Sequence, residues 1–228
     1  AKMKQIDTYL QSIKSEVENG SKSINTFNVY NKDLNKFEGH FHLSTIEDIK
    51  ALRVDDYKSF YQAQKLSPNS INSLIRSLSA FHVYLVDAEY IEETHPFFKV
   101  KFGKSHFMEV KKQKKVVLTP AEETMLIGAG RNLQEIFMLS MMLKTALRRD
   151  EICNIKIADI HGCEIVFTSK GGNQGKTYLD NDLCAMMGRY MTIERKTNSE
   201  YLFYGTRGES NGKMTGTSVN NRVRECAK

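Results

Sequence analysis

The 228-residue sequence has no tryptophan, three prolines, four cysteines and no apolar run long enough to cross a bilayer. We therefore do not expect a membrane protein. The cysteines are widely spaced and form no Cys-x-x-Cys pair: Cys153, Cys163, Cys184 and Cys226. This spacing favours reduced thiols in a cytoplasmic protein over a disulfide framework or a zinc site. No basic-then-apolar leader opens the sequence, which also favours the cytoplasm.

Basic residues outnumber acidic ones. Lysine and arginine total 33 against 27 acids, which gives a net charge of +6 and a pI near 9.0. A basic balance is typical of proteins that bind nucleic acid, although many basic proteins bind none. Hydrophobic residues make up 40% of the chain, an ordinary value for a soluble protein, and the length is sufficient for two domains.

The first hundred residues are predicted to form a small bundle of four or five helices. Apolar residues recur there at spacings of three and four in the segments 3–17, 24–37, 49–61 and 71–85. Ser23 and Ser67 are predicted N-caps, and Ser44 with Glu47 forms a capping-box pattern. This half of the sequence shows no catalytic constellation.

A lysine-rich connector is predicted between two domains. The apolar period is lost after Lys99, and the lysines gather at Lys111, Lys112, Lys114 and Lys115. Thr119, Pro120 and Glu122 then supply an N-cap, a first-turn proline and the partner of a capping box. We expect domains at 1–108 and 118–228, joined by a basic linker at 109–117.

The second domain is predicted to combine helices with a small β-sheet. A nearly apolar helix spans 133–143, and helical spacing returns at 183–191 and at 217–227. Between them, 164–168 and 176–179 predict a β-hairpin around the glycine-rich segment 171–175. A further short strand is predicted at 200–204. The whole chain is therefore predicted to be mainly α-helical with a small β-sheet.

The segment from Leu143 to Ile152 (Leu-Lys-Thr-Ala-Leu-Arg-Arg-Asp-Glu-Ile) resembles the first catalytic box of the tyrosine recombinases, or phage integrases. Arg148 takes the place of the family's arginine and Glu151 that of its acidic residue, whereas Ala146 replaces the usual glycine. Arg149 beside Arg148 creates a one-residue ambiguity, which the spacing to Glu151 resolves in favour of Arg148. Taken alone, the two arginines would be interpreted as a solvated helix end.

The resemblance assigns chemistry to two basic residues. A guanidinium such as that of Arg148 can bond two non-bridging oxygens of a phosphodiester as negative charge gathers on them. Lys170 resembles the family's β-hairpin lysine, which protonates the departing 5′ oxygen; the alternative is a plain turn lysine. A nucleotide-binding loop ending at Gly175-Lys176-Thr177 is excluded, because Lys170 stands where the motif needs glycine and a strand follows where it needs a helix.

The segments 23–37 and 67–85 resemble the two signature helices of the family's core-binding domain. The resemblance implies an N-terminal helical-bundle (SAM-like) core-binding domain and an α+β catalytic domain that is incomplete at its C-terminus. It also implies double-stranded DNA as the partner, assembly on DNA as a dimer or tetramer, no metal or other cofactor, and a bacterial or phage protein at the nucleoid. DNA contacts are expected from Arg76, Arg149 and the four linker lysines, although such linkers are often only solvated.

Two family elements are absent from this sequence. None of the six histidines has an arginine three positions later, and no candidate for the nucleophilic tyrosine follows such a box. Tyr201 and Tyr204 lie upstream of where the nucleophile belongs and are interpreted as core or surface residues. We expect a chain that ends before the nucleophile, binds DNA weakly and cleaves none. The alternatives are a non-catalytic DNA-binding regulator and, with less support, a helical protein-interaction module.

Overall fold

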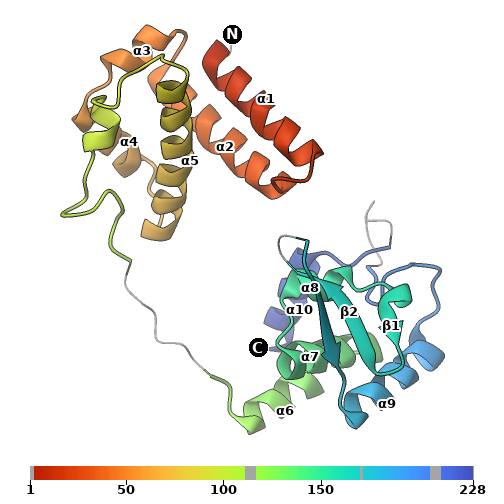
Figure 1. Ribbon diagram of the computed structural model, residues 1–228. Coiled ribbons are helices and arrows are strands. Elements are labelled where there is room, and N and C mark those ends of the chain that lie inside the picture. Colours follow the sequence, from red (N-terminus) through yellow and green to blue (C-terminus); the bar gives the residue numbers. More distant parts are fainter. Residues whose placement is uncertain (1–2, 111–116, 170–171, 206–211, 228) are drawn as a thin grey trace. The chain divides into compact units, whose positions relative to one another are not determined.

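The computed structural model describes residues 3–110, 117–169, 172–205 and 212–227 (Figure 1). The chain divides into two compact units, Ala1–Lys114 and Lys115–Lys228. Within the described ranges, no helix is long and apolar enough to span a membrane.

The N-terminal unit is a helical bundle, as predicted. Its elements are α1 (Lys4–Glu18), α2 (Ile24–Phe41), α3 (Ile46–Ala51), α4 (Val54–Ala63), α5 (Pro68–Asp87) and the short 3₁₀ helix η1 (Pro96–Lys99). Helices α1 and α2 pack on each other and on α5 (Figure 1). The predicted apolar stripes form the core, in which Ile6, Leu34 and Leu78 are fully buried.

Side-chain caps begin α2 and α5 where the sequence predicts. Ser23 accepts a hydrogen bond from Thr26 N at 3.2 Å, and Ser67 accepts one from Ser70 N at 3.3 Å. The capping box predicted at Ser44 and Glu47 is wrong by one residue. Thr45 is the N-cap of α3 and Asp48 its partner, with Asp48 Oδ2 accepting from Thr45 N at 2.8 Å. Ile49 of this helix lies in the core.

The segment after η1 is tied back to α5. The buried carboxamide of Asn72 donates to Met108 O at 2.9 Å and accepts from Met108 N at 2.8 Å, so one side chain satisfies both backbone groups of Met108. Next to this pair, the guanidinium of Arg76 lies 5.1 Å from the centroid of the Phe107 ring. The residues that lead into the predicted linker, Phe107 and Met108, are therefore fixed against α5.

The C-terminal unit combines helices with one antiparallel sheet. Its elements are α6 (Pro120–Gly128), α7 (Leu133–Thr145), α8 (Arg149–Asn154), η2 (Ile157–Asp159), β1 (Ile160–His161), β2 (Glu164–Thr168), β3 (Gln174–Tyr178), α9 (Asn181–Arg189), the π-helical turn η3 (Tyr190–Glu194) and α10 (Gly216–Cys226). The strand order is β1-β2-β3. Phe137, Ile152 and Tyr190 lie at the centre of this unit's core.

The predicted hairpin is confirmed as β2 and β3, with β3 beginning at Gln174. Phe167 pairs with Gly175 across the hairpin, and a Cβ on Gly175 would come within 2.6 Å of the Phe167 ring, so this position needs glycine. The predicted helix at 217–227 is α10. The strand predicted at 200–204 is not continuous: single bridges join Tyr201 to Lys156 and Tyr204 to Lys213.

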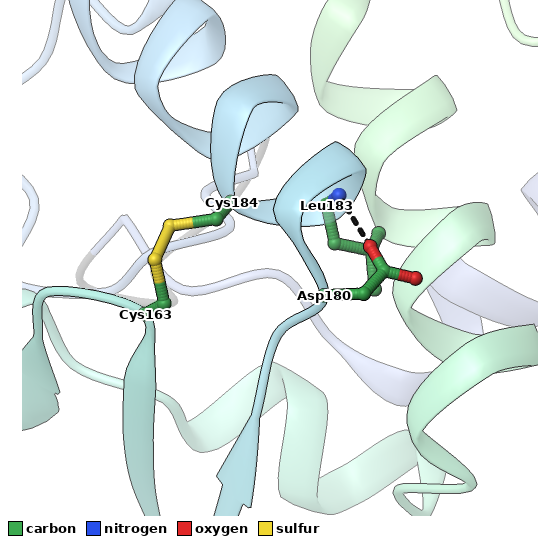
Figure 2. The surroundings of a disulfide bond; sticks show 4 residues. All are labelled: Cys163, Asp180, Leu183 and Cys184. Atoms are coloured by element: carbon green, nitrogen blue, oxygen red, sulfur yellow. Dashed lines mark hydrogen bonds between the residues drawn. A yellow bond between two sulfur atoms is a disulfide. The ribbon is translucent and has the colours of Figure 1, made fainter.

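A disulfide joins Cys163 to Cys184 (Figure 2). Cys163 lies in the turn between β1 and β2, and Cys184 lies in the first turns of α9, whose N-cap is Asp180. The two Cα atoms are 5.5 Å apart although the residues are separated by 21 positions. The prediction of reduced thiols is therefore wrong for this pair, because the fold brings the turn and the helix together. Cys153 and Cys226 are free.

Candidate functional site

The predicted catalytic box forms the junction between α7 and α8. Helix α7 ends at Thr145, and Ala146 follows in the left-handed conformation with φ of 53°. This conformation reverses the chain and favours glycine, which explains why the family's usual residue there is glycine. After buried Leu147, Arg148 is the N-cap residue of α8.

Arg148 is held at two points by Glu151. Its backbone N–H donates to Glu151 Oε2 at 2.7 Å, and its Nη1 donates to Oε1 at 2.9 Å. The arginine side chain is 73% exposed, whereas the glutamate side chain is 6% exposed. A buried carboxylate thus orients a guanidinium whose remaining N–H donors face solvent. An anionic oxygen can therefore bind these exposed N–H groups directly from solvent.

The surroundings of Glu151 favour its ionised form. Burial, the largest influence, acts to raise the pKa of Glu151, but the bonds from Arg148, the charge of Arg148 and the nearby Ser169 side chain outweigh it. The pKa therefore lies below its ordinary value, and the carboxylate is ionised at neutral pH.

The influence of Ser169 on the pKa of Glu151 places the end of β2 near the predicted catalytic box. Ser169 follows β2, and its N–H donates to Asn173 O at 2.7 Å while its carbonyl accepts from Gly172 N at 3.1 Å, which closes the turn. Lys170, the predicted general acid, is the next residue in the sequence and lies outside the described residues. The structure therefore brings together Arg148, Glu151 and the residue that precedes Lys170.

The other predicted DNA-binding residues have different surroundings. Arg149 Nε pairs with Asp150 Oδ1 at 3.0 Å and lies against Gly216, where a Cβ would come within 2.5 Å of it. Arg76 is exposed on α5 and stacks on Phe107. The four linker lysines lie outside the described residues: Lys111, Lys112, Lys114 and Lys115.

A ring of charged residues that the sequence analysis missed holds α10. The carboxylate of Glu135, which is 3% exposed, pairs with Arg131 at 2.9 Å and with Arg222 of α10 at 3.1 Å. Glu225 closes the ring, with Arg131 at 3.2 Å and Arg222 at 3.1 Å. These residues line a polar cavity of about 570 Å³. Only the local spacings, Arg131 to Glu135 and Arg222 to Glu225, could have been seen in the sequence, because the two pairs are far apart along the chain.

Across the described ranges, no group of histidine, cysteine or acidic residues is arranged to hold a metal ion.

Two family profiles match the chain in the order of its two units. The N-terminal SAM-like domain of phage integrases matches residues 6–89, and the phage integrase family matches residues 117–228. The chain belongs to the phage integrase, or tyrosine recombinase, family. The resemblance seen in the sequence is thereby confirmed, as is the expected fold class.

Curated tyrosine recombinases are similar along most of the chain. Tyrosine recombinase XerA of Pyrococcus horikoshii is 26% identical over 214 residues, which cover 92% of this chain and 69% of that protein. A tyrosine recombinase of Pseudothermotoga lettingae is 25% identical over 164 residues, which cover 69% of this chain and 55% of that protein. The chain thus spans 69% of the length of the first relative and 55% of the length of the second.

Solved integrases share the fold. A lambda integrase dimer bound to a COC′ core site gives a TM-score of 0.73 at 13% identity, over 98% of this chain and 79% of that chain. The Tn1549 transposon integrase in complex with circular intermediate DNA gives a TM-score of 0.66 at 19% identity, over 97% of this chain and 78% of that chain. At these identities the likeness shows the fold alone.

Proposed function

We propose that this recombinase cuts one strand of duplex DNA at a specific site by tyrosine attack, holds the strand as a 3′-phosphotyrosyl bond, and rejoins it to a partner strand. The observation that carries the proposal is the Arg148–Glu151 pair, in which a buried carboxylate orients an exposed guanidinium at two points. No metal or organic cofactor takes part in the proposed chemistry.

Arg148 is the proposed oxyanion-binding residue. Its guanidinium would donate to the non-bridging oxygens of the scissile phosphate, whose negative charge increases as the tyrosine attacks. Glu151 acts through Arg148 and is therefore a positioning residue. Because its carboxylate is already bonded and ionised in this structure, little reorganisation is required when the phosphate arrives.

Lys170 is the proposed general acid for the departing 5′ oxygen. Support comes from its neighbour Ser169, whose side chain acts to lower the pKa of Glu151 and therefore lies near that carboxylate. The hairpin that carries Lys170 is thus connected to the residue that orients Arg148. Proton donation and phosphate binding would be brought to one place by this contact.

No tyrosine of this chain is proposed as the nucleophile. Tyr201 and Tyr204 are half-buried and engaged in backbone bridges, so neither is assigned that role. We infer that the present chain binds DNA and does not cleave it. The proposed cleavage also requires the family's second box, with its histidine, arginine and tyrosine, which these 228 residues do not contain.

Duplex DNA is the proposed partner, in keeping with the net charge of +6. The structural relatives include a lambda integrase tetramer bound to a Holliday junction, and we propose that the complete protein likewise assembles on DNA, in the cytoplasm at the nucleoid. Proposed DNA contacts are Arg76, Arg149, Lys111, Lys112, Lys114 and Lys115.

The test is a covalent trapping assay on the chain extended through its reading frame. A nicked substrate that loses a short fragment after cleavage would accumulate a phosphotyrosyl adduct with the wild-type protein. Arg148→Ala and Lys170→Ala should each lower adduct formation at least about 100-fold while DNA binding persists. DNA binding without any wild-type adduct on candidate sites would support a non-catalytic regulator in place of the enzyme.

A further inference from the structure

Lys213 is a long cationic side chain held in place by neutral groups. Its backbone forms a bridge with Tyr204, and its ammonium donates to the Asn154 side-chain oxygen at the C-terminal end of α8. The ammonium also lies 5.6 Å from the centroid of the Tyr201 ring. A ring face attracts a cation without cancelling its charge. Lys213 is therefore restrained but not neutralised.

The other cations around α8 differ from Lys213 in this respect. Each of them forms an ion pair with a carboxylate at 2.9–3.0 Å: Arg148 with Glu151, Arg149 with Asp150, and Lys156 with Glu200. In the part of the chain that the structure describes, no carboxylate pairs with Lys213. A phosphate approaching Lys213 would not have to displace a competing anion.

Lys213 belongs to the same local surface as the catalytic box. Lys213 and Arg149 both act to lower the pKa of Cys153, although burial, the largest influence, leaves that pKa above its ordinary value. Both cations thus lie beside one residue of α8. Arg148 caps the N-terminal end of this helix, and Lys213 contacts the residue at its other end.

We propose that Lys213, presented by Asn154 and Tyr201, binds a backbone phosphate of the duplex a few nucleotides from the phosphate engaged by Arg148. This inference rests on the proposed function, because it assigns a second DNA contact to the same site. Six residues of α-helix span about 9 Å. Duplex DNA occupies that length with about three base pairs. The two ends of α8, at which these cations lie, are therefore separated by a length that spans different phosphates of one site.

The test measures how salt weakens binding of the present chain to a mixed-sequence DNA duplex. Each phosphate contact contributes about 0.9 to the slope of log K against log salt, here between about 50 and 200 mM. Lys213→Ala should reduce the slope by about that amount. Lys144→Ala is the matched control. This variant also removes one positive charge, but Lys144 is already paired with Asp180. The control should leave the slope unchanged.

Asn154→Asp tests the same contact without altering the lysine. A carboxylate at this position would neutralise the Lys213 ammonium, so the slope should fall as it does in Lys213→Ala. Circular dichroism of each variant checks that the helices remain folded.

The outcomes separate the two proposals. A reduced slope in Lys213→Ala and Asn154→Asp, with Lys144→Ala like wild type, supports the contact. If the chain binds DNA but Lys213→Ala has the same slope as Lys144→Ala, this inference is overturned and the proposed function stands. The same holds if Asn154→Asp keeps the wild-type slope. A wild-type chain without DNA affinity at low salt overturns both.

Discussion

Tyr57 and His82 share a hydrogen bond of 2.8 Å inside the N-terminal helical bundle, between the tyrosine hydroxyl and Nε2 of the imidazole. The other ring nitrogen, Nδ1, lies 2.8 Å from the carbonyl of Leu78 and must donate to it. Nε2 is then free to accept from the hydroxyl only if the ring is neutral. The ring also stacks on Phe97, with centroids 3.9 Å apart. The bundle is therefore built around an uncharged histidine.

Acid should weaken the N-terminal unit. Burial lowers the pKa of His82 to about 3 from 6.5, and burial also lowers the pKa of His95. The unfolded chain therefore binds more protons below pH 6.5, so stability is present above that pH and is lost as the pH falls towards 3. Between about pH 7 and pH 5, His82 alone should cost about 2 kcal/mol of unfolding free energy.

Urea unfolding of the N-terminal unit at the two pH values measures this loss, and an NMR titration of the His82 ring measures its pKa directly. The exposed His42 of the same unit provides a control, since His42→Asn should not change the difference between the two pH values. A His82 ring that titrates near pH 6.5 would contradict the prediction.

Ala146→Gly should stabilise the C-terminal unit by about 1 kcal/mol, because Ala146 adopts φ of 53° and glycine carries no Cβ penalty there. Ala129, which ends α6 with φ of −78°, is the matched position. Ala129→Gly should instead destabilise the unit by about 0.5–1 kcal/mol. Chemical denaturation of the two variants checks the difference in sign. Equal destabilisation by both would argue against strain at Ala146.

Removal of the Cys163–Cys184 disulfide should destabilise the C-terminal unit by about 2–4 kcal/mol, because the bond closes a loop in the unfolded chain. The double variant C163S/C184S and the wild type under a thiol reductant should unfold at similar, lower denaturant concentrations. Cys226→Ser, at a free cysteine, should have no such effect. Four reactive thiols in the unfolded, unreduced protein would show that the disulfide is absent.

Glu151→Gln should impair catalysis by the extended chain more than it impairs DNA binding. The glutamine keeps the size of the side chain but lacks the negative charge that pairs with Arg148. We expect adduct formation in the trapping assay to fall about 10- to 100-fold, the usual effect of a lost orienting partner, with DNA affinity within about twofold of wild type. Parallel losses of affinity and adduct would indicate that Glu151 serves DNA binding or folding instead.

Much of the site could be predicted because its signals are local. Arg148 and Glu151 are three residues apart, so their pairing across a helix N-terminus follows from spacing, as does the capping box of Thr119 and Glu122. The hairpin follows from two β-rich segments around a glycine-rich turn. The error at Ser44 arose because two adjacent residues, Ser44 and Thr45, can both cap, and the carboxylate that accepts from the N-cap backbone is that of Asp48, three residues after Thr45.

The tertiary structure decided the rest. Cys163 and Cys184 are 21 residues apart, Asn154 and Lys213 are 59 apart, and Asn72 and Met108 are 36 apart. No local periodicity indicates such pairs, because each exists only where two elements pack together in a defined orientation. The sequence by itself determined the helices, the hairpin and the Arg148–Glu151 pair through contacts between near neighbours. The tertiary fold decided which cation stays unneutralised and which thiols meet, since both depend on the distance between elements remote along the chain.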